Sequence, residues 1–319
     1  MDSMTGYEAN AKRGGASGEI AVRRSLTAGL AERGRDVDVA TSDREFDELC
    51  PPRGRTCDKY DALVLDAWTW AAPGWKAKLN LVGREGRVFL LDFFGAEAPR
   101  RNGIAVPPDR ILTAYPTFPG NTFLGFFYDA PPATTTVINK KKLLGVVWGK
   151  DPKYYAGKEK VLRAVARVAP LHSTLKTPPI GLVGVPNITF HGHLTKEKWS
   201  ALLSEAKFVL GLGDPLLGPS ALDAVAHGST YVDPDYPKLV KQRYGSQHPY
   251  LRQVLGGEPY VCAAKLDDPD SYVRCATRAL QGPPLKSLIL PDFTKPAYMA
   301  RLDKIFFRDQ LGPSTSGIR

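Results

Sequence analysis

The segment GLGDPLLGPSALDAVAHG, residues 211–228, places three glycines and two prolines directly before a short Ala-rich stretch. Glycine has no Cβ and adopts positive φ readily, so such a turn lets the backbone approach a ligand or another part of the chain closely. The apolar run at 207–212 predicts a strand, and Pro219 and Gly228 are typical of the first turn and the end of a helix. A strand, a glycine turn and a helix N-terminus present backbone N–H groups to an anion. The pattern favours a phosphate-bearing ligand, with an ordinary tight strand–helix connection as the alternative.

Histidines and cysteines offer little for a metal site. His191 and His193 form an H-x-H pair, but no third ligand is apparent in the sequence, so we expect no metal. The six residues that separate Cys50 from Cys57 are not a usual zinc spacing, although the two could close a small loop. With Cys262 and Cys275 they make four cysteines, too few and too scattered to predict a disulfide scaffold.

The size and charge of the chain narrow the class of protein. A chain of 319 residues with 43% hydrophobic content is typical of two globular domains. Its formal net charge of +10 indicates an anionic partner: a nucleotide, a nucleic acid or a membrane surface. We expect no membrane segment and no signal peptide, because no stretch approaches 18 uncharged apolar residues and the start of the chain lacks an apolar core.

The elements that would position the turn alternate along the chain. The first part predicts a helix over 18–34 and then strands, and a Pro- and Thr-rich linker follows at 128–136. The strands expected there are DVDVAT (36–41), DALVLD (61–66) and RVFLLDFFG (87–95). Beyond the linker, strands are expected at 143–149, around STL (173–175) and ITFHG (188–192), at 207–212 and at TYVD (230–233). Helices are expected near 157–168, 195–205, 219–227, 269–280 and 296–308.

This alternation predicts an α/β fold of two Rossmann-like domains that face a central cleft. The expected domains are residues 14–130 and 137–310. Ligands of such sheets bind beyond the carboxyl ends of the strands, which is where the turn at 211–220 would lie.

Residues 211–228 resemble the GFGFPYEGPAPLEAIANG stretch of glycosyltransferase family 18, the N-acetylglucosaminyltransferase V family. Other stretches match the family in the same order, over roughly residues 14–310. They are GASGEI (15–20), LLDFFGAEAP (90–99), NTFLGF (121–126), VVWGK (146–150), HGHL (191–194) and SQHPY (246–250). The family's membrane anchor, stem and Cys-rich C-terminal extension have no counterpart in this sequence.

The resemblance implies a GT-B-like enzyme that transfers GlcNAc from UDP-GlcNAc, with inversion, to the 6-hydroxyl of a mannose on N-glycans. It implies no cofactor, no metal, no nucleic-acid partner and a place in the Golgi. The first domain would serve the acceptor and the second the UDP-sugar.

Glu97 follows the predicted strand at 87–92, and the motif match implies that it is the general base. An α-linked UDP-sugar becomes a β-linked product, so the acceptor hydroxyl attacks from the face opposite UDP and a carboxylate must take its proton. A solvated surface charge is the alternative for a loop glutamate.

The resemblance also implies a donor site in the second domain. Asp223, where the family has Glu, would bind the ribose hydroxyls, and Lys238, eight residues before Ser246, would offset the charge of the diphosphate. Lys150 is a further phosphate candidate. The remaining predicted donor-site residues are Gly213, Gly218, Pro219, Ser220 and, near the uracil, His193. Gly15 and Gly18 are expected to pack closely where the first domain's helix begins.

One departure from the family leaves a second function open. Where the family has PYEGP this chain has PLLGP, so Leu217 replaces a carboxylate expected near the donor sugar. A catalytically weak relative that only binds sugar nucleotide or glycan is therefore the alternative, and the net charge keeps a nucleic-acid-binding protein as a third reading. Asn187-Ile188-Thr189 is an N-glycosylation sequon, which suits a secretory lumen.

Overall fold

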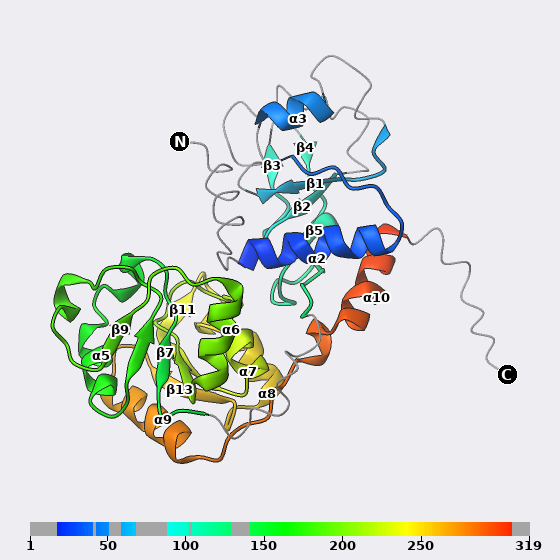
Figure 1. Ribbon diagram of the computed structural model, residues 1–319. Helices are drawn as coiled ribbons and strands as arrows, with labels where there is room; N and C mark the ends of the chain where they lie inside the picture. The colour runs from blue at the N-terminus through cyan, green and yellow to red at the C-terminus, as the bar shows by residue number, and fades with distance from the viewer. Residues whose placement is uncertain are drawn as a thin grey trace. The chain divides into compact units, whose positions relative to one another are not determined.

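The computed structural model describes residues 18–40, 43–50, 59–67, 88–101, 104–128 and 141–307. These residues form two compact α/β units (Figure 1). The first contains Gly18–Tyr128 and the helix at the end of the described chain, and the second runs from 141 to 290. The predicted linker at 128–136 begins where the first unit ends, and its residues 129–136 lie outside the described residues.

The first unit is built on a parallel sheet of four strands in the order β1-β2-β5-β6. The strands are β1 (Leu63–Asp66), β2 (Val88–Leu91), β5 (Ile111–Thr113) and β6 (Thr122–Phe123). Around them lie α2 (Gly18–Glu32), α3 (Asp43–Leu49), the 3-10 turn η3 (Pro108–Arg110) and the antiparallel pair β3 (Arg100–Arg101) and β4 (Ile104–Ala105). Leu65, Leu90 and Ile111 are buried in its core.

Two expectations about this unit need correction. The strand predicted at 36–41 is wrong for its described residues, which are irregular: Val39 is exposed, and none of residues 36–40 pairs with a strand of the sheet. Gly18 opens α2 as expected and is buried, whereas Gly15 lies outside the described residues.

The last described helix, α10 (Lys295–Phe306), follows the 3-10 turn η7 (Pro291–Phe293) and packs against α2. A Cβ on Gly29 of α2 would lie 2.8 Å from Leu302, so glycine is what lets the two helices approach. Arg33 also donates twice to Asp303, at 2.6 Å each. Our assignment of 291–310 to the second domain is therefore wrong for this helix, which completes the first unit.

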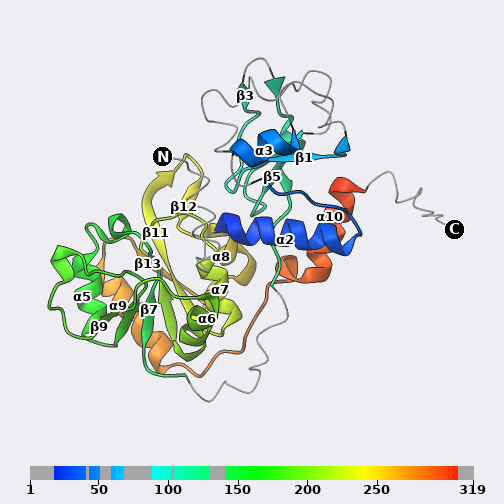
Figure 2. The same cartoon turned by 45° about the horizontal axis from the view of Figure 1, so that its top comes forward.

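The second unit holds a seven-stranded sheet in which six strands are parallel, in the order β9-β8-β7-β10-β11-β13. They are β7 (Gly145–Val147), β8 (Leu171–Ser173), β9 (Ile188–Phe190), β10 (Phe208–Leu210), β11 (Thr230–Val240) and β13 (Val261–Lys265). When the six parallel strands alone are numbered in chain order, this is the order 3-2-1-4-5-6 of nucleotide-binding Rossmann sheets. β11 runs past the parallel sheet and pairs with the antiparallel β12 (Tyr244–Ser246) as a ribbon (Figure 2).

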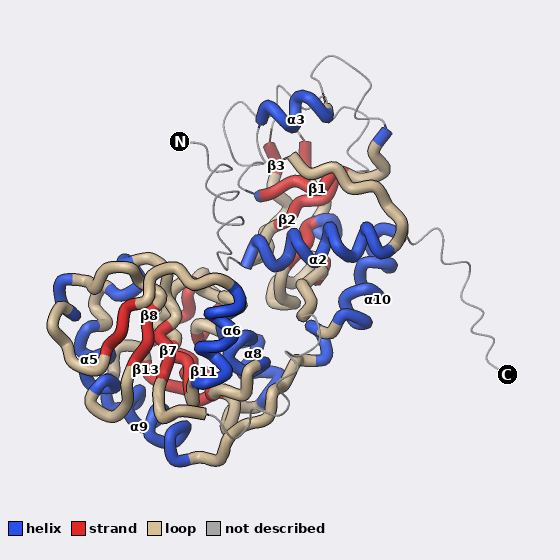
Figure 3. The backbone as a smooth tube through the Cα atoms, in the orientation of Figure 1, coloured by secondary structure: helices blue, strands red, loops and turns tan. Residues whose placement is uncertain are grey.

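Helices cover both faces of this sheet, and the strands run between them (Figure 3). α5 (Glu159–Ala166) packs against α9 (Pro269–Gln281) on one face, and α6 (Lys196–Glu205) and α7 (Ser220–Ala226) lie on the other (Figure 1). Val147, Leu210 and Val232 belong to the apolar core under α5 and α9. Because strand side chains alternate between faces, their buried neighbours Val146, Val209 and Tyr231 point toward the opposite face.

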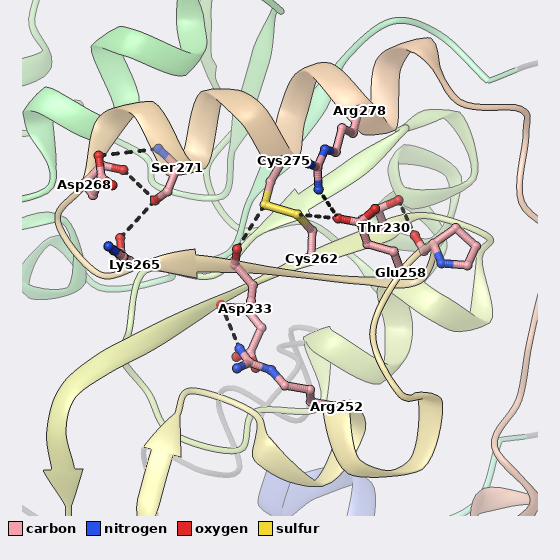
Figure 4. The surroundings of a disulfide bond; sticks show 12 residues. Thr230, Asp233, Arg252, Glu258, Cys262, Lys265, Asp268, Ser271, Cys275 and Arg278 are labelled. Carbon is pink, nitrogen blue, oxygen red and sulfur yellow. Dashed lines mark hydrogen bonds and ion pairs between the residues drawn. A yellow bond between two sulfur atoms is a disulfide. The ribbon is translucent and has the colours of Figure 1, made fainter.

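A disulfide joins Cys262 on β13 to Cys275 on α9, with the Cα atoms 5.7 Å apart (Figure 4). The sequence analysis predicted no disulfide scaffold and did not predict this single bridge: the two cysteines are 13 positions apart in sequence, and the helix folds back onto its own strand. Cys50 is also disulfide-bonded, and Cys57 lies outside the described residues. Within the described part of the chain, no helix has the length and apolar character needed to cross a membrane.

Candidate functional site

The carboxyl ends of β7 and β10 lie side by side where the strand order of the second unit reverses. From β7 the chain continues to β8 on one side, and from β10 it continues to β11 on the other. The loops that leave these two neighbouring strands therefore diverge, and sheets of this topology bind nucleotides at that point. The loop after β7 carries Trp148 to Lys150, and the loop after β10 carries the glycine turn.

The glycines of the turn make room for side chains of the protein itself. A Cβ at Gly218 would lie 1.9 Å from the Trp148 ring, and one at Gly211 would lie 2.2 Å from Oε1 of Gln247. Gly213 has a φ of +93°, in a region that favours glycine. Close approach is thus what the glycines permit, as expected, and the groups that approach are a tryptophan and a glutamine.

Gln247, which follows β12, holds the turn at several points. Its Oε1 accepts from the N–H of Gly213 and from the hydroxyl of Tyr231, both at 3.0 Å, and its Nε2 donates to the carbonyl of Pro215 at 2.9 Å. Its own carbonyl accepts from the N–H of Leu217 at 2.9 Å. The bonds from Gly213 and Tyr231 to Gln247 are buried and shielded from water, whereas the bond to Pro215 is partly buried.

These bonds decide which amides of the turn face a ligand. The N–H groups of Gly211, Gly213 and Leu217 already donate to Val232, Gln247 and Gln247 respectively. In this geometry the N–H of Gly213 is therefore already used within the protein. α7 begins at Ser220, after Pro219, without a side-chain cap, so the first turn of α7 is where the predicted backbone contacts would have to be made.

An ion pair whose carboxylate, Asp233, is fully buried holds His248, the residue that follows Gln247. Asp233, in the parallel part of β11, accepts from the His248 N–H at 2.9 Å. It also accepts from Arg252 at 2.7 Å (Figure 4). Burial raises the pKa of Asp233, and the Arg252 guanidinium opposes that shift. Burial lowers the pKa of His248 to about 3, so its imidazole is neutral at physiological pH and its Nδ1 caps α8 (Pro249–Leu255) by accepting from Leu251.

The predicted donor-site residues occupy different environments. Asp223 is half-buried on α7, and its carboxylate accepts from the Trp199 indole at 3.1 Å. Lys150 is exposed directly after β7, in the loop at the switch point. Lys238 is exposed on β11 beyond Tyr236, whose hydroxyl donates to the carbonyl of Gly213. The structure thus connects the start of the β11–β12 ribbon to the turn.

His193 is exposed in the loop that follows β9, on the outer edge of the sheet. Its neighbour His191 stacks on His172 of β8 with ring centres 4.9 Å apart, and Nε2 of His191 lies 2.7 Å from Nδ1 of His172. Burial and the second imidazole both lower the pKa of His172. Among the described residues no group of three metal-ligating side chains occurs.

Glu97 lies in the first unit, in the loop beyond the carboxyl end of β2, and its side chain is exposed. The loop is shaped by Asp92, whose Oδ1 accepts from the N–H groups of Phe94 and Gly95 at 3.1 Å. It is held farther along by Asn121, whose Oδ1 accepts from the Ala96 N–H at 2.9 Å. Asp92 therefore shapes the turn, and Glu97 is the carboxylate of the loop that faces solvent.

The model of the family described as glycosyltransferase family 18 matches residues 2–314. The chain belongs to glycosyltransferase family 18.

The curated relatives of this family-18 chain are named as one kind of enzyme. This chain is 24% identical to alpha-1,6-mannosylglycoprotein 6-beta-N-acetylglucosaminyltransferase of Caenorhabditis elegans, over 93% of this chain and 51% of the relative. It is 25% identical to the human protein named alpha-1,6-mannosylglycoprotein 6-beta-N-acetylglucosaminyltransferase A, over 91% of this chain and 44% of the relative. The chain thus spans about half the length of the relatives it matches.

Solved structures resemble the family-18 chain in fold. Sucrose-phosphate synthase from Thermosynechococcus elongatus matches with a TM-score of 0.54 at 14% identity, over 93% of this chain and 91% of that one. A glycosyltransferase of avilamycin A biosynthesis matches with a TM-score of 0.52 at 14% identity, over 89% and 84%. These likenesses confirm the expected GT-B-like α/β fold class.

Leu217, where this family-18 chain departs from the family's carboxylate, is fully buried and has a φ of +55°. A side chain in this left-handed conformation is held by its surroundings, here by the bond from its N–H to Gln247. The departure therefore replaces a charge with an apolar group inside the turn.

Three residues of the site were quoted within motifs but given no role by sequence reasoning. Gln247 lies in SQHPY, Asn121 opens NTFLGF and Trp148 lies in VVWGK. Each contacts a backbone segment at least 25 residues away, and no local spacing reveals such a partner.

Proposed function

We propose that this chain is an inverting glycosyltransferase that moves GlcNAc from UDP-GlcNAc to the 6-hydroxyl of a mannose on N-glycans. Family membership and the names of its relatives support the reaction class. The observation that carries the proposal is the 3-2-1-4-5-6 sheet whose switch point holds the family's glycine turn, fixed by the buried side chain of Gln247.

The nucleotide would bind at the carboxyl ends of β7 and β10. Asp223 on α7 would accept hydrogen bonds from the ribose hydroxyls, while Lys238 and Lys150 would offset the diphosphate charge. Both lysines are exposed, so each ammonium can reach a ligand without first being dehydrated by the protein. Gly218, Pro219 and Ser220 would bring the first turn of α7 toward the phosphates, and His193 would lie near the base.

Glu97 would act as the general base. The acceptor 6-hydroxyl oxygen bonds to C1 of GlcNAc while the bond from C1 to the UDP oxygen breaks, and the hydroxyl proton passes to the Glu97 carboxylate. The negative charge that develops on UDP would be offset by Lys238 rather than by a metal ion. Asn121 and Asp92 would keep the Glu97 loop in shape for this step.

Leu217 motivates a second candidate, a relative that binds sugar nucleotide or glycan with little or no transfer. A buried leucine in place of a carboxylate removes a polar contact that a donor sugar could use, because an apolar side chain cannot pair with sugar hydroxyls. This candidate differs from the first only in turnover.

We also propose that the enzyme works in the lumen of the secretory pathway, in the Golgi. The bridge between Cys262 and Cys275 and the bonded state of Cys50 support this placement, because disulfides persist in oxidising compartments.

One assay tests the proposal: release of UDP from a panel of UDP-sugars, with and without a mannose-terminated N-glycan, in buffer with EDTA. We expect release from UDP-GlcNAc that depends on the glycan and survives chelation. Saturable UDP binding without release would favour the second candidate. Turnover that stops with EDTA and returns with Mn²⁺ or Mg²⁺ would refute the role given to Lys238.

A further inference from the structure

Asn187 stands at an exposed turn on the outer edge of the second unit. It precedes β9, which among the described strands pairs with β8 alone and ends the described sheet on that side (Figure 1). Its φ of +65° is a conformation that asparagine tolerates better than most residues. This turn explains why an asparagine is favoured at the position, but it does not explain the residues that follow.

The sequence Asn187-Ile188-Thr189 is a sequon, and the fold leaves it accessible. Asn187 and Thr189 are exposed, whereas Ile188 and Phe190 turn partly inward, as expected for alternating side chains on an edge strand. None of the other five asparagines in the chain is followed by the Asn-x-Ser/Thr pattern. An acceptor site, if used, is therefore unique and easily assigned.

The Asn187 side chain can carry a substituent without losing its present contact. Its Nδ2 donates one hydrogen to the carbonyl of Ala166 at 3.2 Å, and an amide nitrogen has two. Attachment of a sugar replaces one N–H and leaves the other, so the bond to Ala166 at the end of α5 survives.

We propose that Asn187 carries an N-linked glycan. The donor class is a lipid-pyrophosphate-linked oligosaccharide, used by the oligosaccharyltransferase of the secretory pathway. A bond forms between Nδ2 of Asn187 and C1 of the terminal sugar, the bond from C1 to the pyrophosphate oxygen breaks, and the amide proton leaves with the lipid pyrophosphate. The disulfide at Cys262–Cys275 indicates the oxidising compartment in which this reaction occurs.

The neighbourhood of Asn187 supplies a reason for a glycan. Ile180 is 95% exposed and Val183 is 62% exposed, in the loop between β8 and β9. This loop contacts the same helix as Asn187: the Gly181 carbonyl accepts from Arg163 of α5, and Asn187 contacts Ala166 of α5. A hydrated oligosaccharide rooted at Asn187 would cover these apolar side chains, which otherwise favour association.

The glycan would not interfere with the proposed donor site. Asn187 precedes the amino end of β9, whereas the switch-point loops follow the carboxyl ends of β7 and β10, and these strands run parallel. The modification and the proposed donor site therefore lie beyond opposite ends of the parallel strands.

The test is to secrete the full chain from cultured eukaryotic cells behind a cleavable signal peptide. Three forms are compared: wild type, Thr189→Ala, which destroys the sequon, and Thr189→Ser, which keeps it. Thr189 is exposed, so neither change disturbs the core. Gel mobility before and after peptide N-glycosidase, and mass spectrometry of the Asn187 peptide after deglycosylation in ¹⁸O water, report occupancy.

We expect one glycan on wild type and Thr189→Ser, none on Thr189→Ala, and equal UDP binding by all three. The same digest shows whether Cys262 and Cys275 are bridged, which verifies that the chain passed through the oxidising compartment. Secreted wild-type protein with this bridge formed and Asn187 unmodified would overturn the proposal. Because the readout is a mass and not turnover, its failure is separate from failure of the proposed function.

Discussion

In both loops that are proposed to carry the chemistry, a side-chain amide holds the backbone, but the two amides differ in burial. In the second unit, Gln247 accepts from a turn N–H with its side-chain oxygen and donates to a turn carbonyl with its nitrogen. In the first unit, Asn121 accepts from the Ala96 N–H and donates to the carbonyl of Pro108 at 3.1 Å. Each loop follows a parallel strand and contains a glycine at positive φ, Gly213 or Gly95.

The difference between them is burial. Gln247 is fully buried and makes a third side-chain bond, to Tyr231, whereas Asn121 is partly exposed and Glu97 itself projects into solvent. Buried hydrogen bonds are costly to break and fix one geometry, while exposed ones exchange with water. We infer that the turn is a rigid seat for the nucleotide and that the Glu97 loop retains freedom to adjust to an acceptor.

The largest effect is expected from Glu97→Gln. The amide keeps the shape of the side chain but cannot accept the hydroxyl proton, so kcat should fall by roughly 10²–10⁴. The UDP dissociation constant should stay within about twofold, because the proposed nucleotide contacts lie in the other unit. Single-turnover kinetics and UDP titration measure the two quantities. Glu48→Gln, an exposed change on α3, is the control, and near wild-type transfer by Glu97→Gln would show that Glu97 is not the base.

The opposite pattern is expected from Gln247→Leu. Leucine leaves the buried Gly213 N–H and Tyr231 hydroxyl without this partner, at about 1–3 kcal/mol per group, and it also removes the partly buried bond to the Pro215 carbonyl. The turn should loosen, so UDP affinity should fall roughly 10- to 100-fold and the free energy of unfolding should also drop. Gln247→Glu keeps Oε1 but loses the donor to Pro215, so its UDP affinity should lie between those of the wild type and Gln247→Leu. Unchanged UDP affinity in a less stable Gln247→Leu protein would mean that the turn does not seat the nucleotide.

Most of the fold could be predicted from the sequence, because local patterns determine it. Charge-free apolar runs such as 208–212 predicted the buried strands, and Pro219 and Gly228 predicted the ends of α7 closely. Long-range partners could not be predicted. The alternation in DVDVAT (36–41) predicts a strand, yet none of its described residues pairs with a described strand. α10 packs on the first unit at Gly29, which no local pattern reveals.

The same limit applies to the site. The resemblance selected Lys150 and the glycine turn, and the structure places their loops after the neighbouring parallel strands β7 and β10. Spacing could not show that the Gly213 N–H donates to Gln247, because Gln247 lies 34 residues away in sequence and only the fold brings it near.

A smaller effect on donor binding is expected from Lys238→Ala. Loss of one exposed ammonium near a diphosphate should weaken UDP binding roughly tenfold, and the loss should shrink at high salt because exposed charges are screened. Lys241→Ala, a change of the same charge three residues along the same ribbon, is the matched control and should have much less effect. Isothermal titration at two salt concentrations compares them. Equal losses would place the ligand at the tip of the ribbon and not at the turn.

The smallest effect is expected from Asn121→Ala, which removes the clamp from the Glu97 loop alone. Its bonds to Ala96 and Pro108 are partly exposed, so water can replace them at little energetic cost, and the fold should stay intact. Glu97 would sample more positions, and because general-base catalysis depends on placement, kcat should fall roughly 3- to 10-fold with UDP affinity unchanged. Asn121→Asp keeps the acceptor for Ala96 and should recover part of the rate, which a purely structural loss would not do. If kcat instead falls as far as in Glu97→Gln, the Glu97 loop depends on its clamp as strongly as a rigid loop would. The proposed difference in rigidity between the two loops would then be wrong.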